Sequence, residues 1–288
     1  MKHIILGGGN LGKDLLIEMN SLGVADPELW TNSRGKDVRM IADVVAEINH
    51  KMPECVWYCV GAGSVNEAKH ESKHYSNSVI LHRRVPLALA KYLDPKIKLV
   101  LFSTDYVADE TRPTYPFAQT PKFRSNYAAL KGQMENEIQQ MQRPFTTVVR
   151  VGSLYGVHKP EQTFPGKILK NFNGKEGIQL KGLPQNLVVP TPTRWLANVL
   201  LRNFDKLCLD SGATREHVAP EGATTVIDWG KFVLAGMPDV RFNRRDENTF
   251  YYDEERPLVS GLGNTLETSA HWHELWQVYF RKEWFLPK

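Results

Sequence analysis

The chain has 288 residues, of which 42% are hydrophobic and 24% are charged. This composition is typical of a globular protein with one large or two modest domains, and it excludes a disordered chain, a collagen and a coiled coil. A net charge of only +4 argues against nucleic-acid binding. No apolar stretch reaches the roughly 20 residues of a membrane span. The histidines and the three cysteines lack the spacing of a metal site.

Short apolar runs that alternate with helical patterns predict parallel βαβ units in the first 155 residues. The later runs are continuously apolar, as expected of strands that are covered on both faces. We therefore predict an α/β fold with a doubly wound parallel sheet. The expected strands are His3–Leu6, Glu28–Thr31, Val38–Ala42, Cys55–Val60, Lys98–Ser103 and Thr146–Val151.

The first predicted strand runs directly into the motif Gly7-Gly8-Gly9-Asn10-Leu11-Gly12. It fits G-x-G-x-x-G, and leucines at helical spacing follow it until Gly23, which can end that helix. Such glycines permit a tight turn, a close approach of the backbone to a pyrophosphate and close packing of the helix on the strand. Although a flexible turn is the alternative, this context predicts dinucleotide binding by Gly7, Gly9, Asn10, Leu11 and Gly12.

The end of the second predicted strand bears on the type of dinucleotide. An NAD site usually has an acid there, whereas this chain has Ser33 and Arg34 and no acid before Asp37. A hydroxyl and a guanidinium suit a 2′-phosphate, so we expect NADPH ahead of NADH; a solvated arginine in a polar turn is the alternative. Asp43, after the third predicted strand, could contact the adenine or cap the next helix.

A second group of candidates lies on and near a helix predicted from Arg124 to Gln142. Tyr127 and Lys131 are four residues apart and therefore share one face of this helix. A nearby ammonium favours the phenolate and lowers the pKa of a phenol toward a useful range. A surface pair is the common alternative, but Ser103 and Thr104 place hydroxyls at the end of a buried strand, where such sheets bind ligands.

A long helix, with a break at Pro86, is predicted from about Asn66 to Leu93, and Asn77 on it could face the same cleft. Ser103, together with Gly61 and Ala62 after the strand Cys55–Val60, completes the candidates for cofactor binding. Beyond Gly156 prolines and glycines become denser. We therefore predict a dinucleotide-binding domain over 1–156 and a smaller substrate-binding lobe over 157–288, with some segments of the latter returning to the first domain.

With these segments, the sequence resembles the dTDP-4-dehydrorhamnose reductase family of the extended short-chain dehydrogenases. The resemblance spans nearly the whole chain and implies a Rossmann-like fold. It includes an S-T-D-Y-V segment, a stretch that ends in Y-G, a P-T element followed by L-A, and an R-P-x-x-S-x-L-x-N run. In this chain these segments are Ser103 to Val107, Arg150 to Gly156, Pro190 to Ala197 and Arg256 to Asn264.

The resemblance implies a role for each matching residue. Tyr127 would be the proton donor to the carbonyl oxygen, and Lys131 would lower its pKa and bind the nicotinamide ribose. Thr104 would hydrogen-bond the substrate oxygen, and Asn77 would match the helix asparagine of the catalytic tetrad. Asp105, Tyr106 and Arg256 join Thr104 as substrate-binding candidates.

The expected activity is therefore NADPH-dependent reduction of a nucleotide-linked 4-keto-6-deoxy sugar, in deoxysugar or polysaccharide biosynthesis. Ser153 and Gln185-Asn186 depart from the family pattern where the sugar should bind, which leaves the sugar open. A nucleotide-sugar epimerase, a reductase of another ketosugar and a non-catalytic NADP-binding regulatory subunit are the alternatives. Because the apolar part of the N-terminus is too short for a signal peptide, we expect a cytoplasmic protein, with a homodimer as an open option.

Overall fold

Six parallel strands form the central sheet, in the order β2-β1-β3-β4-β5-β9. The structure is a computed structural model that describes residues 2–61, 68–69, 72–107, 125–171, 187–235, 266 and 270–280. The strands are β1 (His3–Leu6), β2 (Glu28–Trp30), β3 (Cys55–Tyr58), β4 (Lys98–Thr104), β5 (Thr146–Val151) and β9 (Thr214–Val218). The predicted α/β fold with a doubly wound, Rossmann-like parallel sheet is confirmed.

The predicted strand Val38–Ala42 is wrong. Val38 is buried but lies in a turn, and helix α2 (Ile41–Lys51) begins three residues later. The apolar residues of this segment continue at helical spacing, because Val44, Val45 and Ile48 form the buried face of α2. The short apolar run was therefore the start of a helix. The other predicted strands are confirmed to within two residues at their ends.

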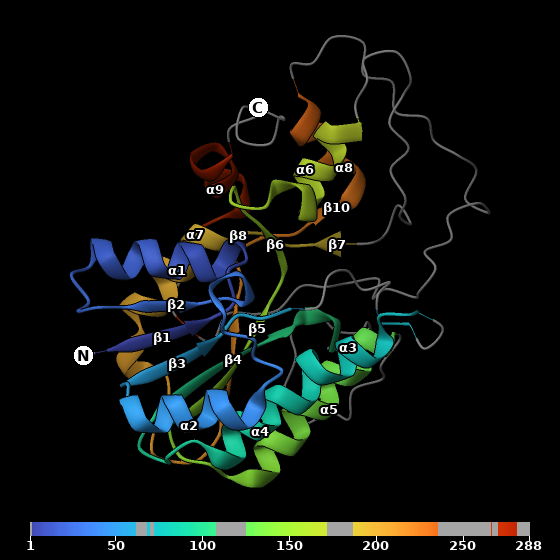
Figure 1. Cartoon of the computed structure of the whole chain (residues 1–288). Helices are drawn as coiled ribbons and strands as arrows, with labels where there is room; N and C mark the ends of the chain where they lie inside the picture. Colours follow the sequence, from blue (N-terminus) through green and yellow to red (C-terminus); the bar gives the residue numbers. More distant parts are fainter. Residues whose placement is uncertain are drawn as a thin grey trace.

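Helices cover both faces of the sheet (Figure 1). Helices α1 (Asn10–Ser21) and α7 (Thr193–Arg202) pack on one face, and α2, α4 (Val85–Tyr92) and α5 (Asn126–Met141) lie on the other. Along each strand the side chains alternate between the two layers, as the pleat requires. In β3, for example, Val56 and Tyr58 belong to the layer of α2 and α4, whereas Trp57 belongs to that of α1 and α7.

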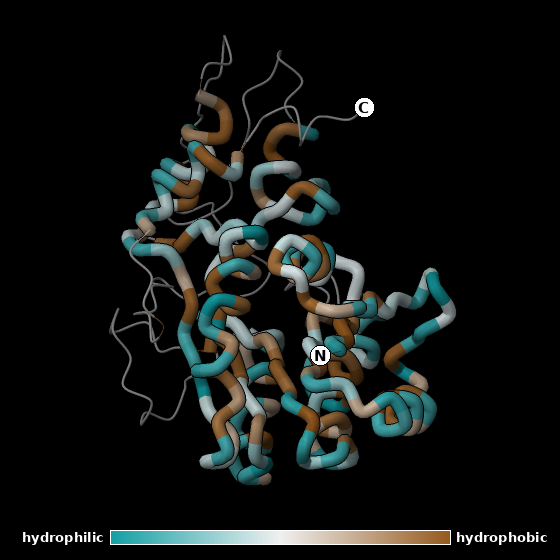
Figure 2. The backbone as a smooth tube through the Cα atoms, turned by 90° about the vertical axis from the view of Figure 1, so that its left-hand side faces the viewer, coloured by the Kyte–Doolittle hydropathy of each residue, from teal (hydrophilic) through white to brown (hydrophobic). Residues whose placement is uncertain are grey.

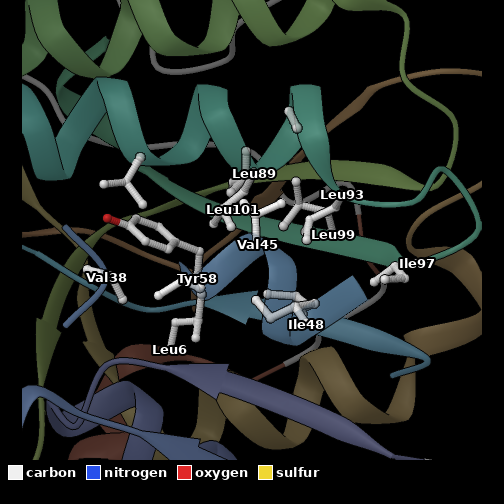
Figure 3. Close-up of a cluster of buried hydrophobic side chains, with 14 of the residues drawn as sticks. Leu6, Val38, Val45, Ile48, Tyr58, Leu89, Leu93, Ile97, Leu99 and Leu101 are labelled. Atoms are coloured by element: carbon white, nitrogen blue, oxygen red, sulfur yellow. The ribbon is translucent and has the colours of Figure 1, made fainter. Parts of the chain in front are cut away.

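The layer of α2 and α4 is a closely packed apolar core (Figure 3). Ile48, Leu89 and Leu99 are completely buried in it. Burial of one such side chain contributes roughly 1.5–3 kcal/mol, so this layer fixes the sheet on which the site is built. The labelled side chains are Leu6, Val38, Val45, Ile48, Tyr58, Leu89, Leu93, Ile97, Leu99 and Leu101.

The helix before β4 contains a π-helical turn. Helix α3 (Tyr75–Val79) continues through the π turn η3 (Ile80–Arg84) into α4. The predicted start near Asn66 lies outside the described residues, and 72–74 are not helical. In a π turn the carbonyl of Leu81 would receive the N–H of Pro86, which has none. The hydroxyl of Tyr58 donates to that carbonyl instead, at 2.8 Å. The helix therefore continues past Pro86 without a break, and the predicted irregularity takes the form of a π turn that ends at Arg84, two residues before the proline.

A smaller lobe stands at the carboxyl end of the strands (Figure 1). Its core is rich in aromatic rings: that of Trp229 lies 4.6 Å from Phe164 and 5.9 Å from Tyr155, between ring centroids. Hydrophobic residues occur in the helices and strands of both parts (Figure 2). The elements of the lobe and its connection are β6 (Ser153–Tyr155), α6 (Phe164–Asn171), β7 (Leu187–Val188), β8 (Pro190–Pro192), β10 (Thr224–Thr225), α8 (Val226–Leu234) and α9 (Trp272–Tyr279).

The chain after Gly156 contributes to the lobe, and it also supplies strand β9 to the sheet and helix α7 to the layer that covers it. The division at 156/157 remains a prediction. Among the described helices, none is long and apolar enough to cross a membrane. Short 3₁₀ helices complete the described structure: η1 (Asn32–Arg34), η4 (Asp105–Val107), η5 (Pro160–Gln162) and η6 (Phe204–Lys206).

Candidate active site

The glycine motif forms a tight turn between β1 and α1. Gly7 has a φ of +112°, and a Cβ atom on it would lie 2.9 Å from the carbonyl carbon of Cys59. A Cβ atom on Gly12 would lie 1.9 Å from the carbonyl oxygen of Gly7. Both positions therefore need glycine, the first for its backbone angle and the second because α1 packs directly on the turn.

The first turn of α1 can receive an anion. Gly9 is the N-cap residue, no side chain caps the helix, and a Cβ atom on Gly9 would meet nothing within 4 Å. The first N–H groups of a helix have no acceptor within it, so those of Asn10 and Leu11 suit a pyrophosphate. The side chain of Asn10 is already engaged: its amide donates to the carbonyl of Lys159 at 3.2 Å, and its oxygen accepts from the Lys159 N–H at 2.7 Å.

The residues after β2 are exposed and basic. Ser33 and Arg34 lie in η1, where the guanidinium donates to the carbonyl of Leu29 across 3.5 Å. The first acid after the strand, Asp37, is held by Arg39, whose guanidinium lowers its pKa. That carboxylate is thus engaged, which fits a site for a 2′-phosphate better than one for a free ribose hydroxyl.

The remaining candidates are Asp43, Gly61 and Ala62 for the cofactor and Arg256 for the substrate. Asp43 lies in the first turn of α2, exposed, and the N-cap Met40 receives no side-chain hydrogen bond. Gly61 follows β3 at the same end of the sheet as the glycine turn. Ala62 and Arg256 lie outside the described residues.

Helix α5 carries the Tyr–Lys pair close to the sheet. It begins at Asn126, after the N-cap Ser125, whose hydroxyl accepts the N–H of Ala128 at 3.1 Å. Tyr127 is therefore in the first turn, and Lys131 follows one turn later, only 5% exposed. The ammonium of Lys131 donates to the carbonyl of Phe102 in β4 at 2.8 Å. The pair faces the strand end and is not a surface pair.

The carboxyl end of β4 supplies hydroxyl and carboxyl groups beside Tyr127. Thr104 donates to the carboxylate of Asp105 at 3.1 Å and accepts the N–H of Tyr106 at 3.3 Å. The rings of Tyr106 and Tyr127 meet edge to face, 6.3 Å apart. Ser103 is buried, and its Oγ has no hydrogen-bond partner among the described residues. A buried hydroxyl without a partner fits a site that a ligand completes.

The pKa of Tyr127 differs from the expectation. Burial raises it well above its usual value, and the carboxylate of Asp105 acts in the same direction, whereas a hydrogen bond with Thr104 opposes them. The expected lowering by Lys131 is not among the causes. Burial lowers the pKa of Lys131 to about 8, against the opposing effect of Glu135. The phenol is therefore protonated at neutral pH and able to donate.

Sequence reasoning missed His82, which touches Tyr127. Asn77 is half-buried in α3, and five residues later the buried ring of His82 meets that of Tyr127 edge to face, 5.0 Å between centroids. The π turn brings this histidine to α5, and no periodicity rule for an α-helix would have found it.

Reasoning from motifs also missed the buried ion pair of Glu135 and Arg150, behind Lys131. Its signal was present, because Glu135 continues the four-residue spacing of Tyr127 and Lys131 along α5.

A separate cavity of about 340 Å³ lies among α1, α7 and α9, with Asp14, His158, Arg194 and Tyr279 in its lining. It belongs to the layer of α1 and α7, on the opposite face of the sheet from α5. The cavity is therefore distinct from the Tyr–Lys site.

Comparisons with known proteins agree with this geometry. The sequence model of the RmlD substrate binding domain family matches residues 1–274. A dTDP-4-dehydrorhamnose reductase from Clostridium acetobutylicum superposes with a TM-score of 0.80 at 23% identity, over 97% of this chain and 98% of that chain. The reductase of the same name from Bacillus anthracis, in complex with NADP, gives 0.81 at 21%, over 96% and 98%.

The fold is shared more widely. UDP-glucose 4-epimerase from Thermotoga maritima superposes with a TM-score of 0.73 at 15% identity, over 99% of this chain and 98% of that chain. A search of curated protein sequences finds no match. The match to the family model covers most of the chain and confirms the predicted class, an NAD(P)-dependent oxidoreductase of the extended short-chain type. The chain belongs to the RmlD substrate binding domain family, and the predicted membership of the dTDP-4-dehydrorhamnose reductase family is confirmed.

Proposed function

We propose that the protein reduces the keto group of a nucleotide-linked 4-keto-6-deoxy sugar with NADPH. The observation that carries this proposal is the convergence of Tyr127, Lys131 and Thr104 at the carboxyl end of β4. The same edge of the sheet carries the glycine turn, which is where parallel sheets bind their ligands.

Each side chain has a chemical task in this reaction. NADPH, when bound, supplies the hydride that reaches the carbonyl carbon. Tyr127, half-buried and protonated, donates its proton to the carbonyl oxygen as negative charge develops there. Thr104 hydrogen-bonds the same oxygen. Lys131 places a positive charge one turn below the phenol, which stabilises the phenolate left after proton transfer.

The cofactor residues support NADPH, with NADH as the weaker alternative. The N–H groups of the first turn of α1 would hold the pyrophosphate, and Ser33 and Arg34 would hold the 2′-phosphate. Arg34→Ala should weaken NADPH binding by roughly ten- to a hundredfold, because a charge-assisted contact contributes about 1.5–3 kcal/mol. NADH binding should stay nearly unchanged. Equal losses for both cofactors, measured by fluorescence titration, would assign Arg34 a structural role.

The test of the activity is NADPH oxidation with a panel of nucleotide 4-ketosugars, with the stereochemistry of the product read by NMR. Tyr127→Phe should lower kcat by about 10²–10⁴-fold and leave NADPH affinity nearly unchanged, because it removes only the acid. An epimerase would instead interconvert two nucleotide sugars without net oxidation of NADPH. A wild-type protein that oxidises no NADPH with any of these sugars, yet binds NADPH and co-purifies with another enzyme, would support the regulatory-subunit alternative.

The proposal extends to substrate recognition, location and assembly. We propose that the lobe after Gly156 holds the nucleotide, so the free ketosugar should be a very poor substrate, because binding energy from the remote group is lost. A cytoplasmic location and a homodimer belong to the same proposal. Analytical ultracentrifugation tests the dimer, and a monomer at assay concentration would remove it.

A further inference from the structure

Glu135 is a buried carboxylate on the same helix as the proposed proton donor. Tyr127, Lys131 and Glu135 follow one another at intervals of four residues on α5. Lys131 is 5% exposed and Glu135 only 1%. Residues four apart on a helix are neighbours, so Glu135 follows Lys131 by one turn, in the direction away from Tyr127. A buried charge of this kind persists only with charged or hydrogen-bonding partners.

Arg150 fixes the position of this carboxylate. Its Nε lies 3.0 Å from both oxygens of Glu135, and its Nη2 donates to one of them at 2.6 Å. Arg150 is in β5, directly opposite Ser103 of β4 in the sheet register. Arg215 of β9 approaches the same carboxylate at 3.9 Å. The two-oxygen contact holds the carboxylate to the sheet and limits its rotation.

Lys131, by contrast, has little support of its own. An ammonium has three donors, and the carbonyl of Phe102 is its acceptor among the described residues. Burial lowers the pKa of Lys131 to about 8, and the negative charge of Glu135 acts against this lowering. Without the carboxylate, nothing among these causes would oppose the cost of burying the ammonium.

The other ionisable groups around this part of α5 do not replace Glu135. His217, the partner of Arg150 on the adjacent strand β9, is neutral, because burial and the two arginines lower its pKa to about 3. Asp105 acts on Tyr127, where it raises the pKa. Besides Lys131, the ionisable groups on these elements are Tyr127, Glu135 and Glu137 on α5, His82, Arg83 and Arg84 on η3, Lys91 and Tyr92 on α4, Lys98 on β4, Asp105 and Tyr106 on η4, Arg150 on β5, and Arg215, Glu216 and His217 on β9.

We propose, on the basis of the reductase function above, that Glu135 is the positioning residue of this site. Arg150 holds the carboxylate of Glu135, and this carboxylate keeps the ammonium of Lys131 charged and directed at the carbonyl of Phe102. The role is indirect, since Glu135 acts through Lys131 and contacts neither sugar nor cofactor. The pair of Glu135 and Arg150 thereby connects β5 to the chemistry on β4 and α5.

The test measures the pKa of Lys131 directly. In the full chain, with lysine labelled with carbon-13 at Cε, the NMR signal of Lys131 is assigned by its loss in Lys131→Met and is followed against pH. Glu135→Gln should lower this pKa by about one unit or more, because the negative charge that opposes the effect of burial is lost. Glu135→Asp keeps the charge at a greater distance and should give an intermediate value.

The matched control is Glu137→Gln, the same change two residues further along α5. Glu137 pairs with Arg83 at 2.7 Å, and both side chains are about a third exposed. This variant should leave the pKa of Lys131 unchanged. In kinetic assays the alkaline fall of kcat/KM should move to lower pH in Glu135→Gln by the same amount as the NMR value, and it should not move in Glu137→Gln.

A folded Glu135→Gln protein with the wild-type pKa at Lys131 would overturn the proposal. If that variant does not fold, Glu135→Asp decides, and a wild-type value in it would overturn the proposal as well. Failure of the reductase function looks different: the NMR shift would be present while the wild-type protein oxidised no NADPH. That result would support the effect of Glu135 on the pKa of Lys131 and would contradict a role of this effect in reduction.

Discussion

Helices α1 and α5 lie on opposite faces of the sheet, and each buries two ionisable side chains four residues apart. On α1 these are Asp14 and Glu18, 3% and 7% exposed; on α5 they are Lys131 and Glu135. The acids of α1 are satisfied from outside the helix. Asp14 accepts from Thr193 at 2.5 Å and from the ring of His158 at 2.9 Å.

The second acid of α1 is bonded in the same way. Glu18 pairs with Arg194 and accepts from Asn198 of α7 at 3.1 Å. These bonds join α1 to α7 and to His158, and they give each carboxylate oxygen of the two acids a partner. The ammonium of Lys131, by contrast, has three donors and only one acceptor among the described residues, the carbonyl of Phe102. A buried charged group with more hydrogen-bonding positions than protein partners indicates a functional site. A buried charged group whose charged atoms each have a partner indicates a structural link between two elements.

Lys131→Met should produce the largest effect of the changes that test this distinction. We expect kcat to fall by about 10³-fold or more, beyond the loss in Tyr127→Phe, because the charge that stabilises the phenolate and a ribose contact both disappear. NADPH binding should weaken as well. The free energy of unfolding should not decrease, since a buried cation with little support is removed. Steady-state kinetics and urea unfolding test both statements. A Lys131→Met protein that is destabilised but fully active would show that Lys131, like Asp14, has a structural role.

Asp14→Asn should show the opposite pattern. It weakens two charge-assisted hydrogen bonds, so we expect the free energy of unfolding to fall by about 2–4 kcal/mol and kcat to change by less than about twofold. Urea unfolding and the NADPH assay provide the two measurements. Asp205→Asn, at an exposed position in η6, is the control and should stay within about 0.5 kcal/mol of wild type. A large loss of kcat with unchanged stability would contradict the distinction.

The smallest predicted effect, counted per pH unit, is the acid sensitivity of the cluster behind α5. His217 has a folded-state pKa of about 3 against an ordinary value of 6.5. Between these values the unfolded chain binds the proton and the folded protein does not, so stability is lost as pH falls from about 6.5 toward 3. The slope should be at most about 1.4 kcal/mol per pH unit. Urea unfolding against pH should show this slope in wild type and a flatter one in His217→Gln. Identical slopes would show that His217 binds its proton equally in the folded and unfolded protein, and would contradict the prediction.

The sequence predicted those parts of the site that depend on neighbouring residues in the chain. The glycine turn needs only a strand, three glycines and a helix in succession, and Tyr127 and Lys131 need only helical spacing. Gly23 also ends α1 as expected, with a φ of +71°. In each case the relevant contacts lie within a few residues of the motif, so local rules are sufficient.

The missed features depend on the order of the strands. Glu135 meets Arg150 and, beyond it, His217 only because β4, β5 and β9 are adjacent in the sheet. The bond from Asp14 to His158 joins residues 144 positions apart. The false strand Val38–Ala42 has a different cause, since a run of five residues is too short to separate the period of a strand from that of a helix.

The π turn before Pro86 has a consequence for how this helix is compared with others. A π turn holds one residue more than the α turn that it replaces, and one residue corresponds to a rotation of about 100° in an α-helix. The segment with Asn77 is therefore out of phase with α4, and the hydroxyl of Tyr58 anchors the offset to β3 at Leu81. A helical wheel drawn continuously from α4 would turn Asn77 away by more than a quarter of a revolution. Two separate helical wheels, one for the segment before η3 and one for α4, are needed to describe which side chains of this helix face α5.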